Sequence, residues 1–151
     1  VHAVEPSQKA IEEGSKLYPF INFQRATGAS MNYEKGYFDL VIINSVFHWV
    51  SRENLLETIT KIDNVIKYGG YLIIGDFQIW HPAKKNYHHI KEEKCWTYKL
   101  DYKKIFLATG LYKEVATLSM NHDNKTLTTE TDIHNYFSVS LLKKEDLYDT
   151  I

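Results

Sequence analysis

The sequence predicts an α/β protein with parallel strands, mainly because of a strand–helix–strand run in the first half of the chain. Residues 38–44 read FDLVIIN, an apolar run without alternation that is typical of a parallel strand covered on both faces. A stretch with helical spacing follows, and YGGYLIIGDF at 68–77 supplies a second apolar strand. These pieces form a right-handed βαβ unit, so functional residues are expected at the carboxyl ends of its strands.

A shorter strand–helix–strand pattern precedes this unit. We expect a strand at 1–4, then a helix opened by Pro6, which has no N–H group to leave unpaired in a first turn. Gly14 is the expected end of that helix. A second short strand is expected at 21–23, and a loop over 24–37 connects it to the central strand.

The helix of the βαβ unit has its own boundary signals. Ser51 is a good N-cap, and apolar residues recur with helical spacing from Leu55 to Ile66. The pair Gly69 and Gly70 is expected to end this helix and to turn the chain into the second strand.

The C-terminal third predicts a helix, an antiparallel hairpin and a last helix. We expect the first helix over 101–109, where a glycine follows it, and an alternating strand over 112–120. A turn at 121–125 leads to the start of an antiparallel partner at 126–129, and residues 131–142 are expected to be helical.

Composition limits the possible partners. The chain has 151 residues, which suits one domain, and 18 basic against 19 acidic residues give a net charge of −1. Neither nucleic acid nor anionic lipid is therefore an expected partner, and no apolar run approaches the roughly 20 residues of a membrane span. The one cysteine, Cys95, cannot form an internal disulfide, which favours a cytoplasmic location. No metal site is expected, because the chain has neither paired cysteines nor an HxxxH spacing.

His48 is the candidate catalytic residue that the sequence itself offers. It follows the central strand, and an imidazole titrates near neutral pH, so it could orient a substrate or take its proton. The alternative is a histidine with a purely structural role.

Five segments carry a family resemblance: VHAVEPSQKAIEEG, ATGASMNY, FDLVIINSVFHWV, YGGYLIIGDF and LATGLYKEV. In this order and spacing they resemble the class I S-adenosylmethionine-dependent methyltransferases, read from the second strand of that family onward. The FHW triplet is similar to small-molecule methyltransferases of the trans-aconitate and biotin-pathway type. The resemblance implies a Rossmann-like, mostly parallel sheet with a C-terminal antiparallel hairpin. It also implies a single domain over 1–151 that is truncated at the N-terminus, without the family's first strand and glycine-rich loop.

The resemblance implies a site for S-adenosylmethionine. Glu5 would accept hydrogen bonds from the ribose hydroxyls and Pro6 would pack on the adenine. Thr27 and Gly28 stand where the family often has Asp-Ala beside the adenine edge. The remaining residues implied for the methyl donor are Met31, Asn44 and Ser45. For Glu5 the alternative is an exposed carboxylate at a helix N-terminus, and for Asn44 it is strand termination.

The methyl acceptor is expected to be a small molecule bound on the opposite side of the crevice. The aromatic-rich segment 77–100 would form a cap over it, and His48 would face it. The candidate acceptor-binding residues are Trp49, Trp80, His81, Tyr87 and Trp96. Transfer by direct displacement needs in-line alignment and exclusion of water, and transfer to a carboxylate needs no base.

Two other functions fit parts of the pattern. A non-catalytic methyltransferase-like module would act through protein contacts, and a nicotinamide-dependent oxidoreductase fragment would also place Glu5 against a ribose. We further expect unpaired sheet edges that invite self-association.

Overall fold

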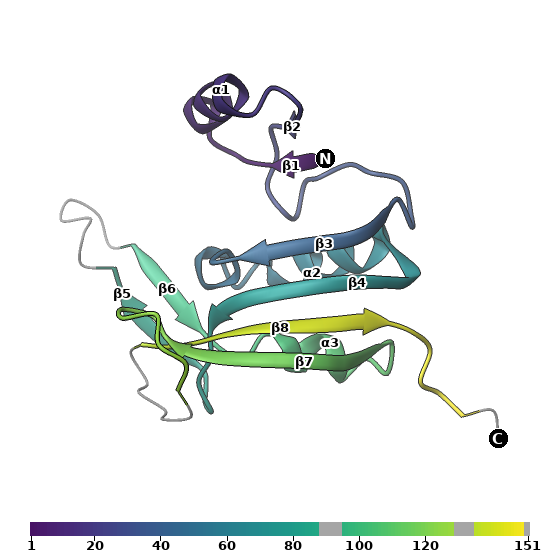
Figure 1. The fold of residues 1–151 in the computed structure, drawn as a ribbon, viewed down its shortest axis with the longest axis vertical. Helices are drawn as coiled ribbons and strands as arrows, with labels where there is room; N and C mark the ends of the chain where they lie inside the picture. The colour runs from purple at the N-terminus through teal and green to yellow at the C-terminus, as the bar shows by residue number, and fades with distance from the viewer. Residues whose placement is uncertain (88–94, 129–134, 150–151) are drawn as a thin grey trace.

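The computed structural model describes residues 1–87, 95–128 and 135–149, and its centre is a mixed four-stranded sheet (Figure 1). The strand order is β3-β4-β8-β7, in which β3 and β4 run parallel while β8 is antiparallel to both neighbours. The bounds are β3 (Phe38–Asn44), β4 (Ile66–Phe77), β7 (Tyr112–Asn121) and β8 (Tyr136–Lys144). The predicted α/β class is therefore confirmed, with a mixed sheet and the expected antiparallel pair at the C-terminal end.

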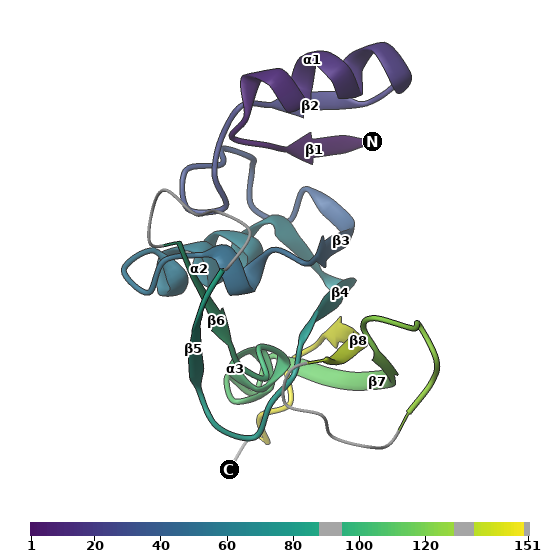
Figure 2. The same cartoon turned by 90° about the vertical axis from the view of Figure 1, so that its left-hand side faces the viewer.

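The N-terminal residues form a separate layer beyond β3, as both views show (Figures 1 and 2). It comprises β1 (His2–Val4), α1 (Gln8–Leu17) and β2 (Asn22–Gln24), with the two strands paired in parallel. The predicted end of the helix at Gly14 is wrong, because α1 continues to Leu17. Gly14 serves packing instead, since a Cβ there would lie 2.9 Å from the ring of Phe23.

The crossover helix α2 (Leu55–Val65) confirms the βαβ unit, although both of its predicted boundaries are wrong. The N-cap is Asn54, because the Ser51 carbonyl accepts from the Asn54 N–H in a turn that precedes the helix. At the other end the chain enters β4 directly at Ile66. The two expected terminal glycines lie inside β4, where the β3–β4 register shifts, and Gly69 has a φ of 79°.

The strand β8 corrects the C-terminal prediction. Residues 136–142 were expected to be helical, but they lie in the middle of the sheet, hydrogen-bonded to β4 and β7. A strand with neighbours on both edges buries residues of both faces, here Phe137, Ser138 and Leu142. Such a sequence lacks clean alternation, so periodicity does not separate it from a helix. Residues 131–134 lie outside the described part.

Shorter elements surround the carboxyl end of β4. They are the 3-10 turn η1 (Phe47–Trp49), the antiparallel strands β5 (Ala83–Asn86) and β6 (Trp96–Lys99), and the helix α3 (Lys103–Leu107). The predicted helix over 101–109 is confirmed in its central turn, and Gly110 follows with a φ of 70°. Of the strand expected at 126–129, Leu127 forms an isolated bridge with Met120, and residue 129 lies outside the described part.

The core lies on one face of the four-stranded sheet, under α2 and α3. Phe47, Leu72 and Leu142 are fully buried there. The other face is less covered, since Ile42 of β3 is 62% exposed. Among the described residues, the outer edge of β3 has no strand partner.

A buried ion pair joins the end of α2 to β8. The Lys144 ammonium lies 2.8 Å from Asp63 Oδ1 and donates to the main-chain carbonyls of Asp63 at 2.6 Å and Ile66 at 3.2 Å. The Tyr112 hydroxyl donates to the same carboxylate at 2.8 Å. Lys144 therefore adds a charged donor to the Asp63 carbonyl, which also accepts from the Ile66 N–H, at the C-terminal end of α2, where a positive charge is favourable.

Lys144→Met should lower the free energy of unfolding by about 1.5–3 kcal/mol, because the charged hydrogen bonds to the Asp63 and Ile66 carbonyls are lost. Lys143→Met is the matched control. Lys143 pairs with Glu145 at 2.9 Å on the surface, so its loss should cost much less than the loss of Lys144. Urea unfolding of both variants measures the difference, and equal losses would contradict the capping role.

Stability should decline at alkaline pH because of two buried tyrosines. Burial raises the pKa of Tyr102 to about 12, and burial together with the hydrogen bond to Asp63 raises the pKa of Tyr112. A raised pKa in the folded state gives stability that is complete below the unfolded value of 10.0 and lost toward pH 12. Tyr102→Phe should make the decline in unfolding free energy between pH 10 and 12 shallower. An unchanged slope would contradict this.

Candidate functional site

The carboxyl ends of β3 and β4 lie at the same edge of the sheet because the two strands are parallel, and the arrow of β1 points toward the same side in Figure 1. At this edge the chain leaves β3 through Ser45, whose φ of 57° lies in the left-handed region. The Ser45 N–H donates to the Gly75 carbonyl at 2.7 Å. A Cβ at position 75 would overlap Asn44 Oδ1, so Gly75 makes room for the Asn44 side chain. Such backbone strain gathers at functional sites.

A buried His–Asp pair follows immediately. His48, in η1, is 6% exposed, and its Nδ1 lies 2.8 Å from Oδ1 of Asp76, which is 4% exposed. Asp76 Oδ2 accepts from the His48 main-chain N–H at 3.2 Å, and Oδ1 also accepts from the Phe77 N–H at 2.7 Å. Asp76 is absent from the residues predicted from sequence. Its position at the carboxyl end of an apolar strand, in GDF, is the signal that could have identified it.

Aromatic rings surround the histidine. The His48 ring centroid lies 5.0 Å from that of Trp49 and 5.2 Å from that of Phe77. Trp49 in turn meets Tyr87 edge-on, with ring centroids 4.8 Å apart. The structure thus brings two of the predicted acceptor-binding residues, Trp49 and Tyr87, together beside His48.

The other predicted acceptor-binding residues lie elsewhere on the segment 77–100. Trp96 on β6 is covered by the Lys84 ammonium, 4.1 Å from its ring centroid. Trp80 is 69% exposed and His81 is also exposed. These three residues have no recorded ring contact with His48 in the described part of the chain.

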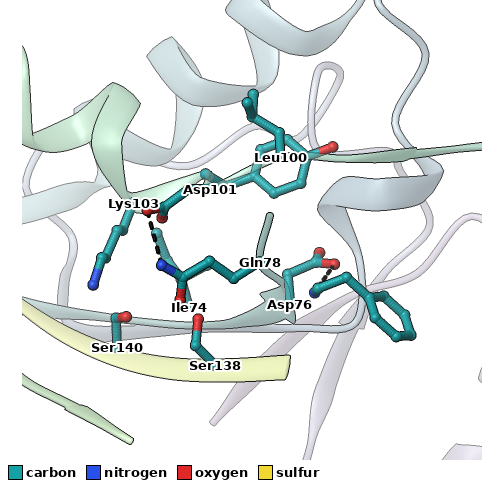
Figure 3. Close-up of a pocket in the computed structure, with 10 residues that line it drawn as sticks. Ile74, Asp76, Gln78, Leu100, Asp101, Lys103, Ser138 and Ser140 are labelled. Atoms are coloured by element: carbon teal, nitrogen blue, oxygen red, sulfur yellow. Dashed lines mark hydrogen bonds between the residues drawn. The ribbon is translucent and has the colours of Figure 1, made fainter. Parts of the chain in front are cut away.

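A small polar pocket lies beside Asp76 (Figure 3). Gln78 crosses it, with its amide nitrogen donating to Asp101 Oδ2 at 3.0 Å. Gln78 Oε1 is buried and has no hydrogen-bond partner within the described residues. Ser138 and Ser140 of β8 line the opposite wall. The pocket therefore presents an unused hydrogen-bond acceptor next to the His–Asp pair.

Among the residues predicted for the methyl donor, Glu5 lies at the carboxyl end of β1. Its N–H donates to the Gln24 carbonyl, and its Oε1 accepts from the Ser7 N–H at 2.8 Å, at the start of α1. That bond occupies one carboxylate oxygen and holds the side chain in place. Pro6 is exposed beside it.

The loop after β2 holds the next three predicted residues. Thr27 closes a turn through hydrogen bonds with Ser30, whose N–H donates to Thr27 Oγ1 at 3.2 Å. Gly28 packs closely on α2, because a Cβ there would lie 2.7 Å from Thr58 Cγ2. Met31 is 7% exposed and belongs to the core.

The described residues contain no group of three or more His, Cys, Asp or Glu side chains suited to hold a metal ion. None of their helices has the length and apolarity needed to cross a membrane.

Comparison with known proteins gives a consistent result. Residues 1–74 match the family described as Methyltransferase domain. No curated protein sequence matches the chain. Among solved structures, a Methanosarcina mazei S-adenosylmethionine-dependent methyltransferase aligns with a TM-score of 0.73 at 14% identity, over 96% of this chain and 82% of that protein.

Two further structures contain bound S-adenosylhomocysteine. The Burkholderia thailandensis 1,6-didemethyltoxoflavin-N1-methyltransferase aligns with a TM-score of 0.70 at 12% identity, over 97% of this chain and 61% of that enzyme. The N-methyltransferase NodS from Bradyrhizobium japonicum aligns with a TM-score of 0.66 at 11% identity, over 95% of this chain and 65% of that enzyme. The chain therefore spans less than two thirds of the length of either protein.

The strand order and the similarity to these solved structures define a Rossmann-like α/β fold of the kind found in class I methyltransferases. Over residues 1–74 the chain is therefore similar to the methyltransferase-domain family, and its fold is similar to that of S-adenosylmethionine-dependent methyltransferases.

Gly28→Ala should lower the free energy of unfolding by about 1–3 kcal/mol, because the new methyl group overlaps Thr58 Cγ2 in a buried contact. Thr58→Ser removes that methyl group while keeping the hydroxyl, so the double variant should recover most of the loss. Denaturant unfolding of the two single variants and the double variant gives the coupling energy. Additive losses would show that the two positions do not touch.

Proposed function

We propose that the protein transfers a methyl group from S-adenosylmethionine to a small molecule. The observation that carries the proposal is the match of residues 1–74 to a methyltransferase domain, because that segment contains every residue predicted for the methyl donor. The strand directions support it, since β1 and β3 point toward the same side in Figure 1 and Glu5 and Asn44 stand at their carboxyl ends. The bound 1,6-didemethyltoxoflavin of the Burkholderia enzyme makes a small-molecule acceptor the natural expectation.

The residues predicted for the methyl donor would contact three parts of S-adenosylmethionine: the ribose, the adenine and the methionine. Glu5 would use its remaining carboxylate oxygen for a ribose hydroxyl, while Pro6 packs on the adenine. The turn at Thr27 and Gly28 would face the adenine edge, with Met31 behind it in the core. Asn44 and Ser45 would contact the methionine part, where the strained backbone presents main-chain polar groups.

The segment 77–100 would form the acceptor side of the site. Trp49 and Tyr87 supply aromatic surface beside His48, which suits a planar or apolar molecule. Trp80, His81 and Trp96 would complete the cap when the acceptor is bound. In the transfer itself, a lone pair of the acceptor attacks the methyl carbon, and the S–CH₃ bond breaks with its electron pair going to sulfur. Alignment and exclusion of water supply most of the rate.

Calorimetric titration with S-adenosylhomocysteine tests the proposal. We expect saturable binding, and Glu5→Gln should weaken it by about tenfold to a hundredfold, since a charged hydrogen bond contributes about 1.5–3 kcal/mol. Glu13→Gln, on the exposed side of α1, is the matched control and should bind normally.

The two rival functions have distinct outcomes in the same experiment. Binding of NADH in place of S-adenosylhomocysteine would favour the nicotinamide-dependent oxidoreductase. Binding of neither ligand would favour the non-catalytic module. Self-association through the free edge of β3 and a cytoplasmic location stay predictions.

A further inference from the structure

We propose that His48 and Asp76 form a proton-accepting pair, so that the methylated atom is a heteroatom bearing a proton, an O–H or N–H group, and not a carboxylate. This inference rests on the proposed methyl transfer and adds the chemical class of the acceptor. It assigns Asp76 as a positioning residue, which acts through His48.

The hydrogen bonds around Asp76 determine the tautomer of His48. An ionised carboxylate only accepts hydrogen bonds, and Asp76 accepts from two main-chain N–H groups as well as facing Nδ1 at 2.8 Å. Nδ1 must therefore carry the proton in this contact. A neutral imidazole with its proton on Nδ1 leaves Nε2 as a bare lone pair, which can take a proton.

Nε2 is available for this role. Within the described residues, no hydrogen bond to His48 Nε2 is formed, and the ring is held from its other side by Asp76. The neighbouring rings of Trp49 and Phe77 restrict its rotation and keep the surroundings apolar. General-base catalysis needs a base that is held in a fixed position, and His48 is held in this way among the aromatic rings.

Charged groups near the pair come from several elements. Lys99 of β6 places its ammonium 4.0 Å from the Phe77 ring centroid, and the tilted ring of His122 has its centroid 4.9 Å from that of Phe77. Arg52, after η1, donates to the Phe47 carbonyl. Asp76 is the charged group hydrogen-bonded to the His48 ring, so it is the one that stabilises an imidazolium directly.

The transfer forms one bond to the methyl carbon and breaks its bond to sulfur. A lone pair of the acceptor oxygen or nitrogen forms the new bond to the methyl carbon, and the sulfonium becomes a neutral thioether. The proton of the acceptor heteroatom moves to His48 Nε2, and the resulting imidazolium is paired with Asp76. A carboxylate acceptor has no proton to lose, so a base held in this way would serve no purpose for it.

A nuclear magnetic resonance measurement tests the pair without any acceptor. Two-bond ¹H–¹⁵N spectra of the imidazole, assigned with His48→Gln, should show the proton on Nδ1 and a bare Nε2 at pH 8. Asp76→Asn should shift the population toward the Nε2–H form. Asp149→Asn, in an exposed C-terminal position, is the matched control and should leave the spectrum unchanged. A protonated Nε2 in the unmodified protein, or no response to Asp76→Asn, would overturn the assignment.

A matched set of probes tests the acceptor class. The protein is given S-adenosylmethionine with 4-methylphenol, 4-methylaniline or 4-methylbenzoate, and release of S-adenosylhomocysteine is measured. We expect turnover of the phenol or the aniline and a loss in kcat of about 10²–10⁴-fold in His48→Gln, with unchanged affinity for S-adenosylhomocysteine.

Three results would overturn the inference while leaving the proposed function intact. These are turnover of the benzoate alone, an unchanged kcat in His48→Gln, and failure of both proton-bearing probes in a protein that binds S-adenosylhomocysteine. If S-adenosylhomocysteine does not bind at all, the proposed function fails, and the resonance measurement still decides the His48–Asp76 pairing.

Discussion

The parallel pairing of β3 with β4 is the constraint on which the rest of the structure depends. It requires α2 to cross one face of the sheet, which places the main core there. It also brings the ends of both strands to one edge, so that Ser45, His48 and Asp76 meet although 31 positions separate the first from the last. The other side of β4 accepts β8, and through β8 the sheet acquires β7. One strand thus connects the core, the candidate site and the C-terminal half.

Sequence reasoning was most successful where physical signals are local and strong. The two apolar strands and the crossover helix follow from burial on two faces and helical periodicity, and the residue range predicted for β3 is also the one observed. Helix ends were harder. Asn54 replaces Ser51 as the N-cap, and Gly14 lies inside α1, because tertiary packing against Phe23 determines the need for glycine there. The failure at β8 has the same origin, since its burial is decided by β4 and β7, which lie far away in sequence.

The candidate site shows the same division. His48 could be selected from sequence because an imidazole near a strand end has evident chemistry, and the structure places it among aromatic rings. Asp76 is not predicted from the sequence, because an aspartate at the end of a strand is common. Only the fold shows that its carboxylate contacts His48. The orphaned oxygen of Gln78 is likewise a product of three-dimensional packing. Trp80, His81 and Trp96 were grouped by closeness in sequence, which does not by itself bring side chains together.

The position of β8 has a consequence for how the sheet is assembled. In the strand order β3-β4-β8-β7, the strand β7 contacts the rest of the sheet through a neighbour that follows it along the chain. During synthesis from the N-terminus, β7 therefore leaves the ribosome before its only described strand partner exists. The edge of β7 and the edge of β4 that will pair with β8 stay unpaired until β8 is inserted between them. The last strand to emerge therefore completes the sheet, and the buried Lys144 near its end forms an ion pair with Asp63 of α2.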